Sequence, residues 1–315
     1  MNANEQNLVT ADEYFDVEID GTWSSADTSA VTIHNYTTDA TRYINIYTTT
    51  TARHKGVWST SYYMLNAVVG GHYGSLLSIQ SQYVSLSGLQ LTFVSSGGDA
   101  NQQHCINGYS YSKIYNNICK PVWNSPTNGY DLHGIITAGA QNGTWIKIWN
   151  NIVYNCKDSS GNGIGIGHWS QPNSSDEYIY NNTVYNCGKG IRSSYQSNST
   201  VLYNNICNNN GTDYEIPNDT NADNISEDTT SPNDEWDSTA VAFVSETAGS
   251  EDFHLDAGSS AIDGGTTDPG SGLFSDDIDG VTRTGTWDIG ADEYVAGGGG
   301  AAPLTGYMSC QKGIW

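Results

Sequence analysis

The sequence has few basic residues. Only 11 lysines and arginines stand against 34 aspartates and glutamates, which gives a formal net charge of −23. Such a charge opposes binding to nucleic acid, to anionic membranes and to strongly anionic polymers, unless the basic residues cluster locally. We therefore expect no nucleic-acid partner and no membrane insertion, and we attribute most of the charge to a solvated surface that favours solubility.

Long apolar runs are missing as well. No stretch approaches the length that spans a bilayer, and the first residues, MNANEQNLVTADEYF, do not form a secretory signal. The six cysteines include no CxxC pair and no regular framework, so neither a zinc site nor a disulfide scaffold is indicated. If the protein works outside a cytoplasm, either an upstream segment has been removed or the protein is released by a route such as cell lysis.

Small polar residues fill much of the chain instead. Hydrophobic residues make up 37% of it, while glycine (35) and tyrosine (21) are abundant beside many Asn, Ser and Thr. Ser, Asn and Asp compete with the helical backbone, and Gly lowers helix stability. Asn and Gly tolerate the left-handed conformation that turns require. The composition therefore predicts an all-β chain of many short strands and turns, which can form one domain at this length.

A short motif with an Asn-Asn pair recurs along the middle of the chain. An apolar residue precedes the pair by two positions, and further apolar residues follow it. The copies are Ile114-Tyr-Asn-Asn-Ile-Cys119, Ile148-Trp-Asn-Asn-Ile-Val153, Ile179-Tyr-Asn-Asn-Thr-Val184 and Leu202-Tyr-Asn-Asn-Ile-Cys207, with a fainter one at Leu86-Ser-Gly-Leu-Gln-Leu91. A constant motif at irregular spacing indicates one conserved turn between loops of variable length.

Each copy of the motif predicts a strand, a turn and a second strand. A third short strand lies between copies, as in Gly134–Thr137 and Gly163–Ile166. Three strands in each repeat of about 25–30 residues predict a right-handed parallel β-helix of about seven or eight coils. We expect a helical N-terminal cap within residues 1–16, the β-helix over 17–216 and an irregular C-terminal cap over 217–295. A glycine-rich linker and tail follow at 296–315.

Stacked coils turn these sequence columns into ladders. We expect two apolar interior columns, and a third column of Asn side chains bonded from coil to coil, formed by Asn117, Asn151 and Asn182. Which Asn of each pair points inward stays open at this stage. Cys156 and Cys187 should form a buried thiol stack rather than a disulfide. The apolar columns are Leu86, Ile114, Ile148, Ile179 and Leu202, and Leu91, Cys119, Val153, Val184 and Cys207.

The Asn-Asn coils resemble the pectate-lyase-like superfamily of right-handed β-helices. The stretch Asp252–Gly265, with the later segments Asp277–Arg283 and Trp287–Tyr294, resembles the ending of choice-of-anchor Q type β-helix proteins. The resemblance covers roughly residues 8–295 and implies a fold rather than a function, since this scaffold hosts lyases, hydrolases, adhesins and structural parts. It also implies an extracellular or virion-surface location, because similar chains occur on bacterial surfaces and in phage virions.

The resemblance to β-helix lyases directs attention to a small set of titratable residues. Such lyases remove the proton beside a uronate carboxylate with a basic side chain, often with calcium at the carboxylate. Arg192 should point outward, because Ile191 and Ser193 point inward, and His104 and His133 should stack on adjacent coils. Asp131, His133 and Arg192 are the candidate catalytic residues. The alternative is a histidine column bonded to loop backbone.

A second candidate surface is aromatic. The residue after each interior Ile or Leu should face outward, which lines up Tyr115, Trp149, Tyr180 and Tyr203. Flat rings at coil spacing can hold a sugar polymer against their faces, and exposed aromatic patches often mark binding surfaces. The alternative is that the rings stack on one another or lie beneath a loop.

The end of the chain supplies two further candidates. Asp276, Asp277 and Asp279 offer oxygen ligands for calcium, although their spacing is not that of an EF-hand loop, and an exposed acidic turn paired with Arg283 is the alternative. Beyond the linker 296–300 lies an apolar segment that resembles a docking peptide for a protein partner or another subunit. Its apolar residues are Leu304, Tyr307, Met308, Ile314 and Trp315.

Two classes of function remain. We favour a non-catalytic extracellular or virion protein, a rigid rod that docks by its tail and contacts glycans with its side. The basic residues are few, and no dense acidic cluster for calcium accompanies them. The alternative is a polysaccharide lyase or glycoside hydrolase of the same superfamily. No cofactor is expected, apart from calcium as a candidate.

Overall fold

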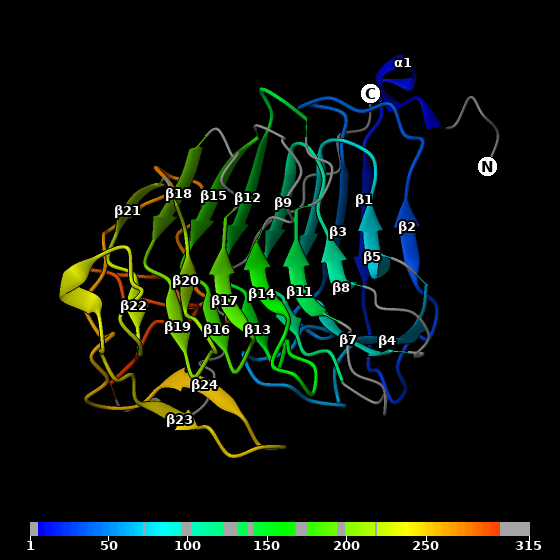
Figure 1. Cartoon of the computed structure of the whole chain (residues 1–315). Coiled ribbons are helices and arrows are strands. Elements are labelled where there is room, and N and C mark those ends of the chain that lie inside the picture. Colours follow the sequence, from blue (N-terminus) through cyan, green and yellow to red (C-terminus); the bar gives the residue numbers. More distant parts are fainter. Residues whose placement is uncertain are drawn as a thin grey trace.

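The computed structural model describes residues 6–71, 73–95, 102–122, 131–137, 141–167, 175–193, 199–217 and 219–296. These residues form a solenoid in which each coil contributes a strand to three parallel sheets (Figure 1). The predicted right-handed parallel β-helix of about seven or eight coils is confirmed. No helix in these ranges is long and apolar enough to cross a membrane.

The three sheets run the length of the solenoid. The first contains β1 (Phe15–Ile19), β3 (Ile44–Thr48), β6 (Val84–Ser87), β9 (Ser112–Tyr115), β12 (Trp145–Trp149), β15 (Asp176–Tyr180), β18 (Ser199–Tyr203) and β21 (Asp219–Ala222). The second contains β4 (Met64–Val69), β7 (Gln90–Ser95), β10 (Ile118–Cys119), β13 (Ile152–Tyr154), β16 (Thr183–Tyr185), β19 (Ile206–Asn208) and β22 (Ile225–Ser226). The third contains β2 (Val31–Ile33), β5 (Gly74–Ile79), β8 (Gln103–Asn107), β11 (Leu132–Ile136), β14 (Ile164–Gly167), β17 (Lys189–Arg192) and β20 (Tyr214–Glu215).

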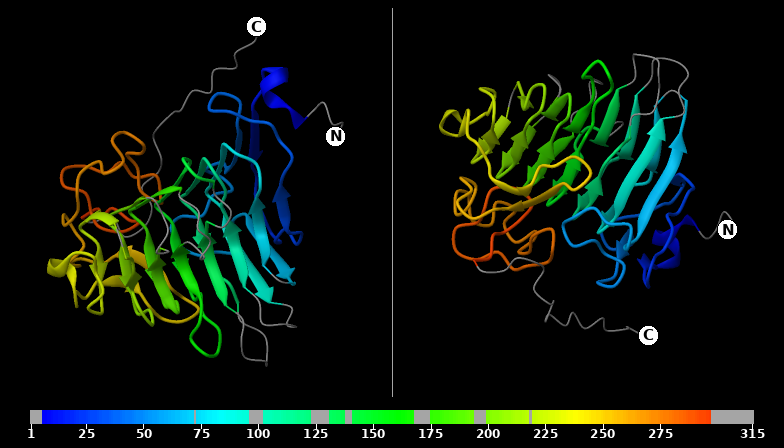
Figure 2. Two further views of the ribbon diagram at one scale, coloured as in Figure 1. Left: turned by 45° about the horizontal axis from the view of Figure 1, so that its top comes forward. Right: turned by 90° about the horizontal axis from the view of Figure 1, so that it is seen from below.

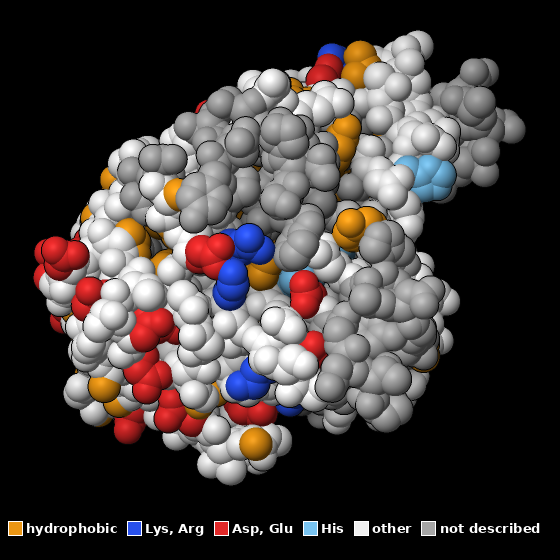
Figure 3. Space-filling view, viewed as in Figure 1, with side chains coloured by type: hydrophobic (Ala, Val, Ile, Leu, Met, Phe, Trp, Pro, Cys, Tyr) orange, Lys and Arg blue, Asp and Glu red, His pale blue; other side chains and the backbone are white. Residues whose placement is uncertain are grey.

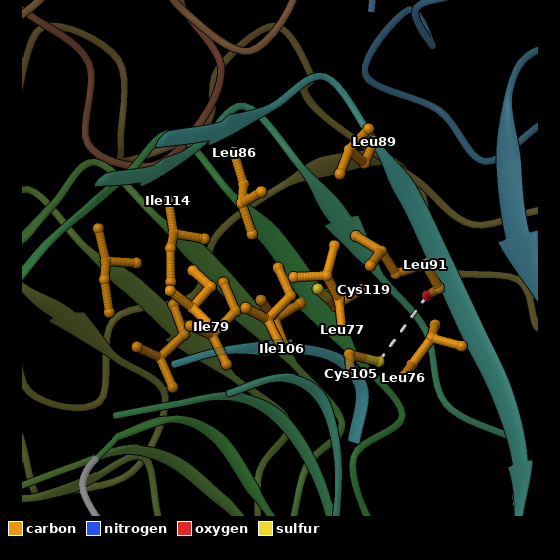
Figure 4. Close-up of a cluster of buried hydrophobic side chains, with 14 of the residues drawn as sticks. Leu76, Leu77, Ile79, Leu86, Leu89, Leu91, Cys105, Ile106, Ile114 and Cys119 are labelled. Carbon is orange, nitrogen blue, oxygen red and sulfur yellow. Dashed lines mark hydrogen bonds between the residues drawn. The ribbon is translucent and has the colours of Figure 1, made fainter. Parts of the chain in front are cut away.

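The interior is filled by the predicted apolar ladders. Ile114, Ile148 and Ile179 are register partners in successive coils, and each is at most 1% exposed. Figure 4 shows Leu86 beside Ile114 in this core. The second column, from Leu91 to Cys207, is also paired strand by strand. The cysteines of the described ranges are buried free thiols, as expected for Cys156 and Cys187.

The two residues of each Asn-Asn pair have different roles. The second Asn points inward: Asn151 is fully buried and donates through Nδ2 to Oδ1 of Asn182, which donates in turn to Asn205. The first Asn adopts the left-handed conformation, with φ of 50° at Asn150 and 48° at Asn181. Asn is among the few residues that accept this conformation readily, which explains its place at the turn.

The N-terminal end differs from the expected cap in one respect. Its helix α1 spans only Leu8–Ala11, so within the described residues the helix takes up a small part of the cap expected at 1–16. The Asn7 side chain caps it by accepting a hydrogen bond from the Thr10 amide, and Asp12 ends it with a φ of 57°. Leu8 is fully buried against the first coil.

The C-terminal region folds back along the side of the solenoid. Strands β21 and β22, which fall within residues 217–295, still extend the parallel sheets. The chain then forms the antiparallel pair β23 (Phe243–Ser245) and β24 (Asp252–Leu255) and runs back past earlier coils (Figure 2). The outward Asn side chains of three turns anchor it by donating to its backbone carbonyls, Asn150 to Asp276, Asn181 to Asp288 and Asn204 to Thr266. The region therefore seals a lateral face as well as following the last coil.

Candidate functional site

The predicted catalytic residues meet on the outer face of the third sheet. Asp131 immediately precedes β11, which carries His133, and Arg192 ends β17 two strands away. Between these strands lies β14, on which Ile164 pairs with Lys189 and Gly167 pairs with Arg192. Nδ1 of His133 accepts a hydrogen bond of 2.9 Å from the Ile164 amide, and its Nε2 lies 4.0 Å from Oδ2 of Asp131.

Burial sets the protonation of this pair. It lowers the pKa of His133 well below its usual value, and nearby His104 and Arg192 act in the same direction. The imidazole is therefore neutral at neutral pH. Burial raises the pKa of Asp131, and Asp158 adds to this rise, whereas Arg192 and Lys189 oppose it. The arrangement places a carboxyl group of raised pKa beside a neutral imidazole.

The cations of this face share one acidic partner. Nε of Arg192 lies 3.2 Å from one carboxylate oxygen of Glu215 on β20, and the Lys189 ammonium pairs with the other oxygen. In the space-filling view, basic side chains lie directly beside acidic ones on the face formed by the third sheet (Figure 3). Each cation is therefore held by an ion pair instead of standing ready as a base.

The expected histidine stack is confirmed. His104 and His133 are register partners, and their ring centroids lie 5.3 Å apart with nearly parallel planes. Nδ1 of His104 lies 3.2 Å from the Ser75 hydroxyl. Both rings are almost completely buried. The two stacked rings therefore pack adjacent coils against each other.

The aromatic strip forms, but the expectation that it is exposed is wrong for its two central rings. Tyr115 and Trp149 stack with centroids 4.2 Å apart, as their register predicts. However, Trp149 and Tyr180 are only 3% and 5% exposed, because Phe274 of the C-terminal region covers both rings. Trp287 joins the same cluster, and Tyr203 lies at its partly buried edge. This face offers no open four-ring platform for a glycan.

The acidic triplet is not the exposed turn that was the alternative to calcium binding. Asp277 is fully buried and accepts hydrogen bonds from the Asp279, Val281 and Glu293 amides, so it holds the turn together. Burial raises its pKa to about 7, and Asp279 and Asp292 add to the rise while Arg283 opposes it.

The partner expected for the triplet is engaged elsewhere. Arg283 is buried and pairs with Glu293 at 3.2 Å, and it also donates to Asn150 of the β12–β13 turn. The expectation that Arg283 pairs with the triplet is therefore not met by these contacts. Asp276 is partly exposed, and Asp279 belongs to a separate cluster with His254.

A cavity that the sequence did not predict opens where the C-terminal region meets the second sheet. It has a volume of about 410 Å³. Lys120, which follows β10, lies between the rings of Trp58 and Tyr154, with Nζ 5.8 Å and 5.1 Å from their centroids. The ammonium also pairs with Glu251 at 3.3 Å. The lining residues are Val57, Trp58, Lys120, Ser245, Gly249, Ser250, Glu251 and Asp252.

Both carboxyl groups of this cavity are ionised at neutral pH. Burial opposes ionisation of Glu251, but backbone amides and the Lys120 ammonium outweigh it and lower its pKa. Burial likewise opposes ionisation of Asp252, and the hydrogen bond and charge of His254 lower its pKa. Nδ1 of His254 lies 2.6 Å from Asp252 and its Nε2 lies 2.8 Å from Asp279. The cavity therefore combines an aromatic ring, a cation and two carboxylates.

Comparisons with known proteins add little to this picture. No protein-family model matches the sequence, and no curated protein matches it. Among solved structures the chain is similar to a pectate lyase, Pel9A, at 14% identity over 89% of this chain and 86% of that one, with a TM-score of 0.38. Structural similarity at this TM-score is too weak to assign a fold, so the fold assignment is based on the three parallel sheets. The predicted tail residues lie outside the described ranges.

Proposed function

We propose that the chain is a non-catalytic extracellular or virion protein, a rigid β-helix that holds a glycan in the cavity beside Trp58. The observation that carries this proposal is the lining of the cavity, where an indole ring adjoins Lys120 and two carboxylates. Sugars present apolar C–H faces and hydroxyl edges, so they fit a pocket with an aromatic ring and a few convergent polar groups. The volume of about 410 Å³ lies in the range of small-ligand sites.

The charge of the lining favours one class of sugar. Lys120 is already paired with Glu251, and Asp252 is paired with His254. The lining residues therefore offer two carboxylates and no unpaired cation for an acidic sugar. Carboxylates accept hydrogen bonds from hydroxyl groups and repel acidic sugars. The formal charge of −23 acts in the same direction. The expected ligand is therefore a neutral or amino-sugar glycan.

The protonation of the cavity supports binding without cleavage. A glycosidase that uses a carboxyl pair needs one of them protonated to deliver a proton to the leaving oxygen. The pKa values of Glu251 and Asp252 are both lowered, so both are bases at neutral pH. On the third sheet, Lys189 and Arg192 are held in ion pairs with Glu215, so neither stands ready as a catalytic base.

A glycan array with matched variants tests the binding site. The wild-type protein should retain a neutral or amino-sugar glycan, and Trp58→Ala should lose it because the ring that stacks on the sugar is gone. Tyr14→Ala is the control, since Tyr14 is an exposed aromatic residue that does not line the cavity. Equal retention by wild type and Trp58→Ala would contradict the proposed site. Circular dichroism should show the same fold in all three proteins.

The tail is the proposed docking segment for a protein partner or another subunit. Its support is the sequence contrast between the glycine tract 296–300 and the apolar residues that follow it. Burying each large apolar side chain is worth roughly 1.5–3 kcal/mol, which can offset the entropy of ordering the segment on a partner. Deleting residues 301–315 should leave the melting temperature unchanged and abolish assembly. Light scattering that gives the same assembled mass after deletion would contradict this role.

One observation favours the second candidate, a polysaccharide lyase or glycoside hydrolase. The half-buried Asp131 carboxyl group, with its raised pKa, lies beside neutral His133, and a poised acid or base requires such a shift. Incubation with a panel of uronate polymers, followed by the absorbance of the unsaturated product, tests the lyase. Activity that Asp131→Asn abolishes would establish this candidate, and its survival in Asp131→Asn and Arg192→Gln would place the chemistry elsewhere.

A further inference from the structure

Three side chains from separate segments of the C-terminal region converge on one point. His254 lies on β24, Asp279 follows the turn at Asp277, and Asp292 lies near the end of the described chain. One imidazole nitrogen and one carboxylate oxygen from each aspartate all lie within 4.8 Å of one another. This spacing lets one ion contact all three groups.

A second observation points to a ligand at this place. Oδ1 of Asp279 is buried and has no hydrogen-bond partner among the residues described, although the Asp279 side chain is only 7% exposed. Burying a carboxylate oxygen without a hydrogen-bond partner costs free energy, so the unpaired Oδ1 acceptor requires an explanation. Oδ1 also converges with Nε2 of His254: a Cβ placed on Gly56 would lie 2.6 Å from the oxygen and 2.4 Å from the nitrogen.

The surrounding contacts orient these groups as metal ligands. Nδ1 of His254 lies 2.6 Å from Oδ1 of Asp252, the carboxylate–imidazole pairing that fixes a metal-binding histidine and here directs its Nε2 toward Asp279. Oδ2 of Asp292 accepts a hydrogen bond of 2.7 Å from the Leu255 amide, which leaves its Oδ1 for an ion. Gly56 has a φ of +69° and no side chain, so the loop that contains it passes directly over the cluster.

We propose that His254, Asp279 and Asp292 form a binding site for one divalent first-row transition metal, zinc or manganese, with Asp252 as the residue that positions the imidazole. One imidazole and two carboxylates suit these ions, whereas calcium and magnesium prefer an all-oxygen set. Nε2 now lies 2.8 Å from Oδ2 of Asp279. Coordination replaces that contact, and any proton on Nε2 leaves to solvent.

The ion would join segments that are distant in sequence. It would tie β24 to the Asp279 turn and to Asp292, next to the loop that carries Gly56 and Trp58. Because Asp252 also lines the glycan cavity, the ion would hold one wall of that cavity in place. The site stands on its own contacts, so metal binding can fail while glycan binding succeeds, and the reverse.

Metal retention by the full chain tests the proposal. The protein is stripped with a chelator, dialysed against zinc or manganese and then against metal-free buffer, and its metal content is measured by mass spectrometry. About one ion per chain is expected for wild type, with at least a tenfold loss in Asp279→Asn and in His254→Gln. The control is His34→Gln, which removes an exposed histidine far from the cluster and should retain the ion.

X-ray absorption on the zinc-loaded wild-type protein gives a second test that needs no variant. Nitrogen and oxygen ligands at about 2.0–2.1 Å, with imidazole scattering, are expected. Sulfur at about 2.3 Å would instead place the zinc on the cysteines and overturn the proposal. Retention well below one ion per chain, or retention of calcium in preference to zinc and manganese, would overturn it as well.

Discussion

The side-chain amide of Asn151 donates a hydrogen bond of 3.0 Å to Oδ1 of Asn182 in the next coil. The same Oδ1 accepts the Asn151 backbone amide, and Nδ2 of Asn151 also reaches the carbonyls of Ile114 and Trp149. One side chain thus satisfies backbone groups of its own turn and of the previous coil. The ladder is the polar seam that keeps the coils in register.

Asn151→Ala should therefore destabilise the solenoid. It leaves the buried Asn117 backbone amide without its acceptor, and it removes one hydrogen-bond partner from the Asn117 side chain and from the carbonyls of Ile114 and Trp149. An orphaned buried amide costs roughly 1–3 kcal/mol, so a loss of at least that size in the free energy of unfolding is expected. Urea denaturation measures it. An unchanged free energy of unfolding in Asn151→Ala would contradict the ladder.

Trp149→Ala should act through packing. The indole is sandwiched between Tyr115 and Phe274, so its removal opens a cavity between the solenoid and the C-terminal region. Large-to-small changes of this kind cost about 3–5 kcal/mol. Thermal melting should show a clear loss, while the glycan bound by wild type should still be retained below the melting temperature. Loss of glycan with unchanged melting would restore the aromatic strip as the binding surface.

His104 should contribute to acid sensitivity. Burial lowers its pKa from 6.5 to about 4, so the unfolded chain takes up its proton first as the pH falls. The stability from keeping this ring neutral is present above pH 6.5 and is lost progressively down to about pH 4, by up to about 3 kcal/mol.

His104→Gln should make the fall in stability between pH 6.5 and 4 shallower, because glutamine does not titrate. It also relieves His133 of one repulsive neighbour, which changes the slope in the same direction. Urea denaturation at a series of pH values measures the slope, and identical slopes in wild type and His104→Gln would contradict the assignment.

The repeat made most of the solenoid predictable. The Asn-Asn pair fixes a turn, and the alternation around it places Ile148 and Ile179 inside and Tyr115 and Trp149 outside, as the register shows. Local periodicity cannot say what covers an outward residue. Trp149 faces outward and is still buried, because Phe274 returns to it from a region without the repeat.

The candidate sites also differ in whether the repeat predicts them. Asp131, His133 and Arg192 come together because they lie on stacked coils, where sequence order gives position. The cavity and the His254 cluster depend on the folded-back chain, which brings Glu251 to Lys120 and Asp279 to Gly56. The stretch from Asp252 to Tyr294 is distinctive in the sequence, but its pattern does not predict which residues of the solenoid it contacts.

The cavity beside Trp58 is proposed to bind a glycan and to leave it intact. Size-exclusion chromatography of the protein after prolonged incubation with the oligosaccharide that the array identifies tests both parts at once. We predict that wild type carries oligosaccharide of unchanged length into the protein peak and that Trp58→Ala does not. Shortened or unsaturated oligosaccharide, or equal co-elution with Trp58→Ala, would contradict the account.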